Sequence, residues 1–370
     1  MPDFASLAQP ALRALRADEP GHDIVALRQR FPHGLCELGS NENPLGPSPC
    51  ALEAVRAALP ELHRYPDPLG GELRAAIAAS HGLRREQVLL GNGSHELLMQ
   101  LAQAFAGPGA GVVASEFGFA VYAIAARAAG ANFTAAPALS VDAAMPRGHD
   151  LAAIASAVST DSRLVYLCNP NNPTGTWFGS AGLRSFLARL PSTVLVVVDE
   201  AYLEYVDDPG LESALGLLAE FPNLIVTRTF SKAFGLAGLR VGYACAHPAL
   251  LAVLDRLRES FNVGIPGLVG ARAALSDHAH LARARAANAA ERTRLAAELS
   301  RRGLRVAPSQ TNFLLVDFSR EAAPVEAALV ANGIVLRPMI GYRLPNCLRI
   351  TVGTREDNDR FLSALDEVIA

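Results

Sequence analysis

Lysine is almost missing from this 370-residue sequence: of its 33 basic residues, 32 are arginine and only Lys232 is lysine. Arginine stays protonated at any usable pH and is a poor nucleophile toward carbonyl groups, which excludes the arginines as imine-forming groups. A desolvated lysine can lose its proton and form an imine. Lys232 either survives by chance in an arginine-biased chain or, as its neighbours in residues 228–240 favour, is kept for covalent chemistry.

The sequence also lacks basic runs and long apolar stretches. Its formal net charge is −3 at pH 7, so nothing suggests a nucleic-acid partner. The arginines between residues 282 and 305 alternate with alanines at helical spacing, which predicts a solvated helix face. Residues 1–30 carry Asp3, Asp18 and Glu19 and no sustained apolar segment, so we expect neither a signal peptide nor a membrane span.

The sequence has few cysteines, and their spacing suggests no disulfide pairs. The five cysteines are Cys36, Cys50, Cys168, Cys245 and Cys347. An odd number without disulfide or metal-ligand spacing is typical of free thiols in a reducing compartment. We therefore expect a cytoplasmic protein without a metal site.

The length and composition predict a globular α/β protein with two domains. Half of the residues are hydrophobic and 19% are charged, which suits a sizeable core. Short apolar runs alternate with segments of helical period, as in crossover units around a mostly parallel sheet. The predicted strands are Val112 to Ala114, Leu164 to Cys168, Val194 to Val198 and Leu224 to Thr227, followed later by Asn312 to Asp317 and Cys347 to Val352. We expect a large domain over residues 40–265 and a smaller α+β domain from residues 1–39 and 266–370.

Polar residues follow three of the predicted strands. Because ligands of open α/β sheets bind beyond the carboxyl ends of the strands, residues 169–175, 199–202 and 229–232 are expected to converge. A lysine, a carboxylate and an asparagine there match the needs of pyridoxal phosphate, whose aldehyde requires an imine partner and whose ring nitrogen requires an anion. Asp199 is the candidate for that anion; the alternative is a helix N-cap.

Six segments in register make the sequence resemble fold type I pyridoxal-phosphate aminotransferases, and among them the histidinol-phosphate aminotransferase family. The resemblance runs from about residue 35 to the C-terminus. Its segments are Ser40 to Pro47, Arg64 to Asp67, Asn169 to Gly175, Asp199 to Tyr202, Ser231-Lys232 with Arg240, and Leu348 to Gly353.

The resemblance implies a full set of cofactor contacts. Lys232 would bind the cofactor aldehyde and move the substrate α-proton, Asp199 would pair with the ring nitrogen, and Phe119 would stack on the ring. Asn172 and Tyr202 would donate to the phenolic oxygen. The residues implied for the phosphate are Gly93, Ser94, His95, Thr229, Ser231 and Arg240.

The same resemblance implies a homodimer with shared active sites, because the tyrosine matching Tyr65 reaches the phosphate site of the neighbouring subunit. For the substrate it implies Arg349 and Arg337, whose planar forks suit carboxylate or phosphate, together with Asn43.

Three positions depart from the family pattern. Asp18 or Glu19 stands where a tyrosine often closes over the substrate, so an acid there would repel a phosphorylated substrate unless the segment docks differently. His95 replaces a more usual acid or amide, and Phe119 replaces a common tyrosine. These departures concern the substrate more than the cofactor.

The predicted activity is transfer of an amino group from histidinol phosphate to 2-oxoglutarate in histidine biosynthesis. One alternative keeps this mechanism with an aromatic amino acid as donor. A second is a lyase resembling threonine-phosphate decarboxylase, which would release carbon dioxide without an oxo-acid acceptor. A third is a cofactor-binding module without catalysis, in which Lys232→Ala would leave the biological activity unchanged.

Overall fold

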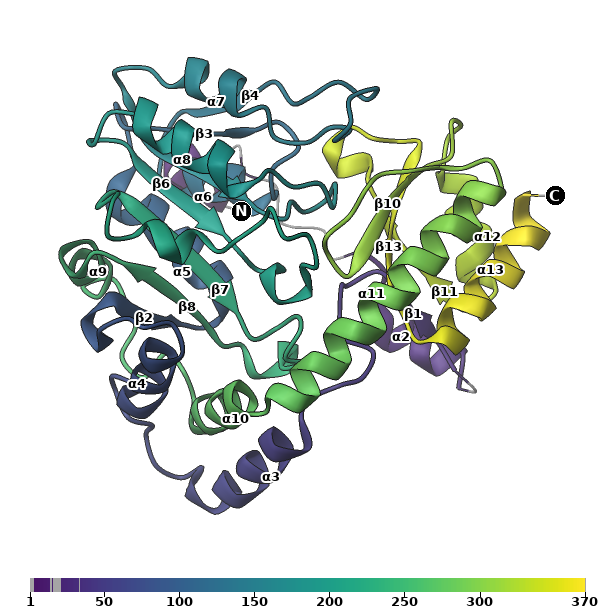
Figure 1. The fold of residues 1–370 in the computed structure, drawn as a ribbon, viewed down its shortest axis with the longest axis horizontal. Helices are drawn as coiled ribbons and strands as arrows, with labels where there is room; N and C mark the ends of the chain where they lie inside the picture. Colours follow the sequence, from purple (N-terminus) through teal and green to yellow (C-terminus); the bar gives the residue numbers. More distant parts are fainter. Residues whose placement is uncertain (1–2, 14, 16–20, 33, 370) are drawn as a thin grey trace.

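The computed structural model describes residues 3–13, 15, 21–32 and 34–369, and two sheets with their helices account for most of them (Figure 1). The larger sheet has seven strands in the order β2-β8-β7-β6-β5-β3-β4. Its strands are β2 (Val88–Gly91), β3 (Gly111–Ser115), β4 (Phe133–Ala136), β5 (Ser162–Cys168), β6 (Leu195–Asp199), β7 (Leu224–Thr229) and β8 (Gly242–Ala246). Neighbouring strands from β4 to β7 are parallel, and β8 runs antiparallel to both β7 and β2. The predicted mostly parallel sheet is confirmed.

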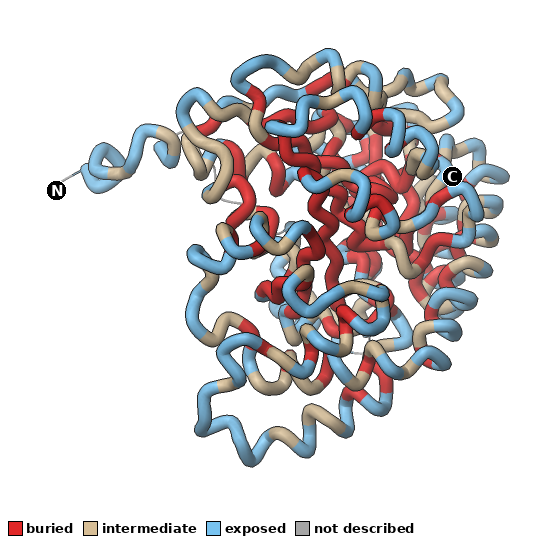
Figure 2. Tube along the Cα trace, turned by 60° about the vertical axis from the view of Figure 1, so that its left-hand side comes forward, coloured by how far each residue is buried: buried red, intermediate tan, exposed pale blue. Residues whose placement is uncertain are grey.

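Helices cover both faces of this sheet, which is why its strands are apolar on both sides. Alternate residues of β6 enter different clusters: Val196 and Val198 pack on one face, and Leu195 and Val197 on the other. The first face is covered by α4 (Gly71–Ser80), α7 (Leu151–Ala157), α8 (Ser180–Arg189) and α10 (Ile265–Ser276), and the second by α5 (Gly93–Phe105), α6 (Val121–Ala128) and α9 (Pro248–Leu254). Figure 2 shows the resulting buried layer running through the molecule.

The smaller sheet lies beside three C-terminal helices (Figure 1). Its order is β12-β13-β10-β9, and all its pairs are antiparallel. The strands are β9 (Arg305–Val306), β10 (Phe313–Asp317), β12 (Arg337–Pro338) and β13 (Cys347–Thr351), and the helices are α11 (His278–Arg301), α12 (Ala323–Ala331) and α13 (Arg355–Ile369). Apolar residues of these helices and of β10 and β13 form one core.

The N-terminal part of the chain joins this smaller unit through a short parallel pair. Strand β1 (Cys36–Glu37) pairs with β11 (Ile334–Val335). The remaining helices are α1 (Pro10–Arg13), α2 (Ile24–Arg30) and α3 (Pro49–Ala58), and the short 3-10 turns are η1 (Phe4–Leu7), η2 (Leu59–Glu61), η3 (Arg85–Gln87), η4 (Leu203–Tyr205), η5 (Ala214–Leu217), η6 (Ala237–Leu239) and η7 (Ile340–Tyr342). The division predicted at residue 265 stays a prediction, because α10 still packs against α3 and α4 of the larger unit while α11 reaches the smaller sheet.

The arginine-rich segment is helical, as predicted. It forms α11. Ala284 and Leu295 of this helix are buried, Arg294 is half-buried, and Arg283 and Arg301 are exposed. No helix in the described residues is long and apolar enough to cross a membrane.

Candidate active site

Three parallel strands bring their carboxyl ends to one edge of the larger sheet. Cys168 at the end of β5 lies opposite Asp199 at the end of β6, and Asp199 lies opposite Thr227 of β7. The segments that follow these strands therefore start side by side. The structure places residues 169–175, 199–202 and 229–232 together as the sequence predicts, although strand β7 extends to Thr229 itself.

Lys232 lies in the tight turn that follows β7 and is partly buried. Its Nζ donates to the backbone oxygen of Ser40 at 3.2 Å and lies 5.9 Å from the centre of the Tyr202 ring. Burial lowers the pKa of Lys232 to about 8, and the charges of Arg349 and Arg240 act in the same direction against that of Glu42. A substantial fraction of this amine is thus neutral near pH 8, as a nucleophile requires.

Asp199 is a buried carboxylate that binds only neutral donors. The Tyr122 hydroxyl donates to its Oδ2 at 3.1 Å and the Thr227 hydroxyl to its Oδ1 at 3.2 Å. Burial raises the pKa of Asp199 to about 6, although both hydrogen bonds lower it. Within the described residues no basic side chain forms an ion pair with Asp199. No helix begins directly after it either, so the side chain is not an N-cap.

This environment fits the cofactor that the sequence suggests. A buried carboxylate without a cationic partner is costly, and a protonated ring nitrogen would supply the missing charge. The sequence reasoning missed Tyr122 and Thr227, which hold the carboxylate. Tyr122 lies three residues after Phe119, and Thr227 lies two residues before Thr229 on the same face of β7. Their spacing from these predicted cofactor residues could have marked both as members of the site.

Arg349 connects the smaller sheet with the loop after β5. Its Nη1 donates to Oδ1 of Asn172 at 2.6 Å and its Nη2 to the backbone oxygen of Gly39 at 2.8 Å. Its Nε is buried and has no hydrogen-bond partner among the described residues. Burial lowers the pKa of Arg349. An arginine that keeps an unpaired buried N–H beside the site has donor capacity for a ligand.

Tyr202 is buried beside Lys232. Its hydroxyl accepts a hydrogen bond from Nδ2 of Asn41 at 2.9 Å, and burial raises its pKa. Asn43 donates from Nδ2 to the backbone oxygen of Ala233 at 2.8 Å and accepts from the Leu45 N–H, and its contact with a substrate stays a prediction. In this arrangement Asn43 holds the backbone next to Lys232. Asn41 was missed, although it lies in the quoted segment 40–47.

The residues predicted for the phosphate gather at the start of α5. Gly93 opens this helix with a φ of +79°, and a β-carbon there would lie 2.7 Å from a side-chain nitrogen of Arg240. Arg240 donates from Nη1 to the Ser231 hydroxyl at 3.3 Å, and the Thr229 hydroxyl donates to Ser231 at 3.0 Å. Hydroxyls, a guanidinium and the amides of a helix start are groups that would suit an anion, and we call this set the anion cradle.

Two further cofactor residues lie at the edge of this group. Ser94 is half-buried in the first turn of α5, whereas His95 is exposed. Phe119 is half-buried, and its ring meets the edge of Tyr122 with the ring centres 5.9 Å apart. Their roles toward a ligand remain predictions.

Arg337 faces Arg349 across β12 and β13, where the two residues are paired in register. Gly21 of the N-terminal segment lies directly against it: with a φ of +87°, a β-carbon at Gly21 would come within 2.6 Å of Nη1 of Arg337. Nε2 of His22 shares a hydrogen bond with Oε1 of the buried Glu326 of α12. Asp18 and Glu19, which were suspected near the substrate, lie outside the described residues.

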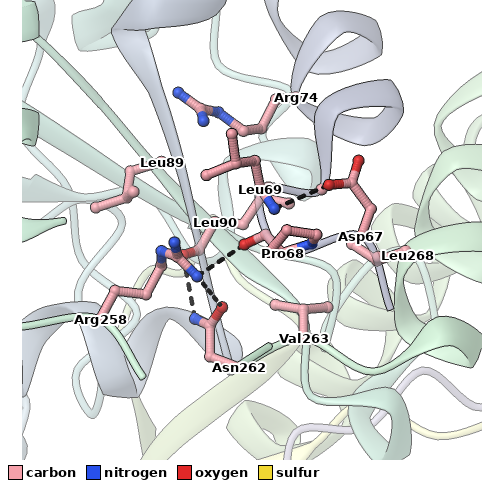
Figure 3. A pocket seen from close by; sticks show the side chains of 11 residues that line it. Asp67, Pro68, Leu69, Arg74, Leu89, Leu90, Arg258, Asn262, Val263 and Leu268 are labelled. Atoms are coloured by element: carbon pink, nitrogen blue, oxygen red, sulfur yellow. Dashed lines mark hydrogen bonds between the residues drawn. The ribbon is translucent and has the colours of Figure 1, made fainter. Parts of the chain in front are cut away.

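Tyr65 lies apart from the other predicted residues. It is 80% exposed, and its ring stacks on Phe261 with the centres 4.5 Å apart. Next to it is the small pocket of Figure 3, where Nη1 of Arg258 donates to the backbone oxygen of Pro68 at 2.9 Å. Neither Lys232 nor Asp199 lines this pocket.

Comparisons with known proteins agree with this geometry. A model of the family "Aminotransferase class I and II" matches residues 34–365. Histidinol-phosphate aminotransferase 2 of Pseudomonas aeruginosa is 47% identical over 373 residues, covering 100% of both chains, and that of Methylococcus capsulatus is 48% identical over 367 residues, covering 99% of both. The crystal structure of histidinol-phosphate aminotransferase from Sinorhizobium meliloti in complex with pyridoxal 5'-phosphate has a TM-score of 0.88 at 31% identity and covers 98% of each chain.

Proposed function

Because this chain belongs to the aminotransferase class I and II family, we propose that it is a histidinol-phosphate aminotransferase that passes the amino group of its donor to 2-oxoglutarate. The family resemblance and the fold type predicted from the sequence are confirmed. The observation that carries the proposal is the joint position of Lys232, with its lowered pKa, and the buried Asp199 at adjacent strand ends. The identity to histidinol-phosphate aminotransferases along the whole chain supports the choice of donor.

Pyridoxal 5'-phosphate bound here supplies an aldehyde that takes up the amino group and a ring that accepts the electron pair of the donor's α-carbon. Asp199 balances the charge of the protonated ring nitrogen. The residues of the anion cradle, Gly93, Ser94, Thr229, Ser231 and Arg240, would hold the phosphate group.

Lys232 has two tasks in this scheme. Its neutral amine would hold the cofactor through the aldehyde. Nζ would also be the base that accepts the proton from the donor's α-carbon, and the ammonium group so formed would be the acid that returns this proton. Asn172 and Tyr202 orient the ring through its phenolic oxygen, and Arg349 and Arg337 bind the anionic group of the donor.

Absorbance spectroscopy tests the proposal. The yellow, cofactor-loaded protein is titrated with L-histidinol phosphate, L-phenylalanine and L-tyrosine separately, without an acceptor. We expect histidinol phosphate to bleach the yellow band at the lowest concentration. Bleaching first by the aromatic amino acids would move the donor assignment, carbon dioxide release would indicate a lyase, and a protein that never becomes yellow after reconstitution would contradict the assignment of Lys232.

We also propose a homodimer, supported by exposed apolar side chains that recur within one segment of the chain. Large hydrophobic residues that are 40% exposed or more stand at Leu45, Leu52, Leu59, Leu62, Tyr65 and Leu69. A partner that covers this segment would remove their apolar surface from water. If Tyr65 acts in the partner's site, mixing Tyr65→Ala with Lys232→Ala subunits restores one complete site per hybrid dimer. Recovered activity supports shared sites, whereas mixtures that stay at the summed activities of the two variants contradict them.

The cysteines support the proposed cytoplasmic location. All five are free thiols; four are buried and only Cys50 is exposed. Burial raises the pKa of Cys36 to about 12, which keeps that thiol protonated and unreactive. A chain that uses its thiols in this way suits a reducing compartment.

A further inference from the structure

Tyr342 lies in the hairpin that carries both substrate arginines. This hairpin consists of β12 with Arg337, the turn η7 ending at Tyr342, and β13 with Arg349. The sequence reasoning assigned no role to Tyr342. Tyr342 thus lies in the chain segment that connects the two paired arginines.

The side chain of Tyr342 contacts the smaller sheet and the loop between β3 and α6. Its ring packs together with Phe117 against a small apolar cluster that includes Met339 and Leu344. Its hydroxyl oxygen accepts a hydrogen bond from the backbone N–H of Ala120 at 3.0 Å. Because Ala120 directly follows Phe119, this bond ties the arginine hairpin to the segment that is proposed to cover the cofactor ring.

The hydroxyl also lies in the electrostatic field of the arginine pair. Burial raises the pKa of Tyr342, and the positive charges of Arg349 and Arg337 both lower it. In return, Tyr342 is one of the groups that raise the pKa of Arg349 against the effect of burial. The hydrogen bond from the Ala120 N–H uses one lone pair of the phenol oxygen. The hydroxyl proton of Tyr342 is still available for donation. In the described residues no hydrogen bond with this hydroxyl as donor is found.

We propose that the Tyr342 hydroxyl is a third hydrogen-bond donor to the anionic group of the substrate, beside Arg337 and Arg349. The Ala120 N–H orients the phenol, so that its proton faces the oxyanion that the two guanidinium groups attract. A phosphate monoester has enough oxygens to accept from all three side chains. The inference rests on the proposed function, from which it takes the role of the two arginines.

The test compares Tyr342→Phe with wild type in the cofactor-loaded enzyme. The variant removes only the hydroxyl and keeps the ring packing. A hydrogen bond to a charged group contributes enough that its loss weakens binding about tenfold or more. We expect the half-saturating concentration of L-histidinol phosphate in the bleaching titration to rise by that factor. The rate at saturation and the affinity for the cofactor should stay within about twofold.

Tyr243→Phe is the matched control. Its hydroxyl shares a hydrogen bond with Nε2 of His81 at 2.8 Å, and its ring packs in the core on the face of the larger sheet covered by α4 and α10. The same chemical change there should leave the half-saturating concentration unchanged. Equal weakening by both variants would show a general loss of packing and overturn the inference.

The outcomes separate this inference from the proposed function. If wild type responds to histidinol phosphate and Tyr342→Phe responds at the same concentration, the inference is wrong and the function stands. If wild type responds only to L-phenylalanine, the proposed donor is wrong. The inference then holds when Tyr342→Phe weakens the response to phenylalanine, whose carboxylate is the anionic group, and it falls when that response is unchanged.

Discussion

At the scale of the residue, burial shifts the pKa values of two ionisable groups in opposite directions. Burial lowers the pKa of Lys232 to about 8 and raises that of Asp199 to about 6. Burial disfavours the charged form of each group. More of the lysine is therefore the neutral, nucleophilic amine, and the ionised carboxylate would be stabilised by a cation beside it. Both shifts serve a cofactor with an aldehyde and a basic ring nitrogen.

Because Lys232 is the only lysine of the chain, covalent trapping has a single expected product. Borohydride reduction of the cofactor-loaded protein should fix one cofactor per chain, and mass spectrometry should find it on the peptide that contains Lys232. The α-amino group is the only other primary amine, and it serves as an internal control. A Lys232→Arg variant should trap nothing on that peptide; a modified terminal peptide alone would contradict the assignment.

The raised pKa of Asp199 makes the stability of the cofactor-free protein depend on pH. The folded state keeps the proton up to about pH 6, whereas the unfolded chain loses it near pH 3.8. The folded state therefore binds more protons between these values, and the contribution of Asp199 to the free energy of unfolding falls as pH rises through this window. The loss amounts to about 3 kcal/mol and stays constant above pH 6.

Asp199→Asn should remove this loss. Urea unfolding of cofactor-free wild type and variant at pH 4 and pH 7 measures the difference, and we expect the variant to gain relative to wild type at pH 7. The same variant should lose activity by roughly two or more orders of magnitude, because an amide does not hold the ring nitrogen protonated. Equal pH dependence in the two proteins would contradict the burial of an ionised Asp199.

At the scale of the element, the proposed anion cradle depends on the close approach of the start of α5 to Arg240, which follows β7 in the chain. Gly93 allows this approach through its positive φ and its missing side chain, which leaves space for Arg240. Helix α5 has thirteen residues, long enough for its dipole to favour an anion at its start.

Gly93→Ala should therefore weaken cofactor binding about tenfold or more, because the methyl group displaces Arg240 and the φ is unfavourable for alanine. Fluorescence titration of the cofactor-free protein with pyridoxal phosphate measures the change. Gly216→Ala is the control, since a β-carbon at Gly216 meets no atom within 4 Å. Equal affinities for the two variants would contradict the role of Gly93 in the cradle.

At the scale of the whole molecule, the proposed interface and the N-terminal arm both expose large apolar side chains. Leu59 and Leu62 are 50% and 55% exposed beside the 80% exposed Tyr65. The arm around Phe4 and Leu7 also stands away from the body in Figure 2 and is exposed. An isolated chain would leave this apolar surface in water.

Replacing both Leu59 and Leu62 by aspartate should convert the proposed dimer into monomers, because charges in an apolar interface cannot keep their hydration. Light scattering coupled to gel filtration measures the mass. The control replaces Val25, which is 66% exposed in α2, by aspartate and should leave the mass unchanged. A wild-type mass of one chain would contradict the dimer itself.

The amino-acid sequence by itself determined the family, the cofactor and the positions of six strands. Local signals marked Lys232, Asp199 and Asn172 as candidates, since each lies at or after the end of an apolar run, and all six predicted strands begin and end within two residues of the observed ones. These properties depend on neighbours along the chain and on the rule that parallel strands end at one edge.

Only the tertiary structure decided which side chains meet across long distances in the chain. Tyr122 on Asp199, Asn41 on Tyr202 and Tyr342 on Ala120 join residues that no local period relates. The same holds for the pKa of Lys232, because burial by the folded chain sets it and not the sequence around it. Hydrogen bonding and desolvation depend on distances in space, and only the folded chain fixes those distances.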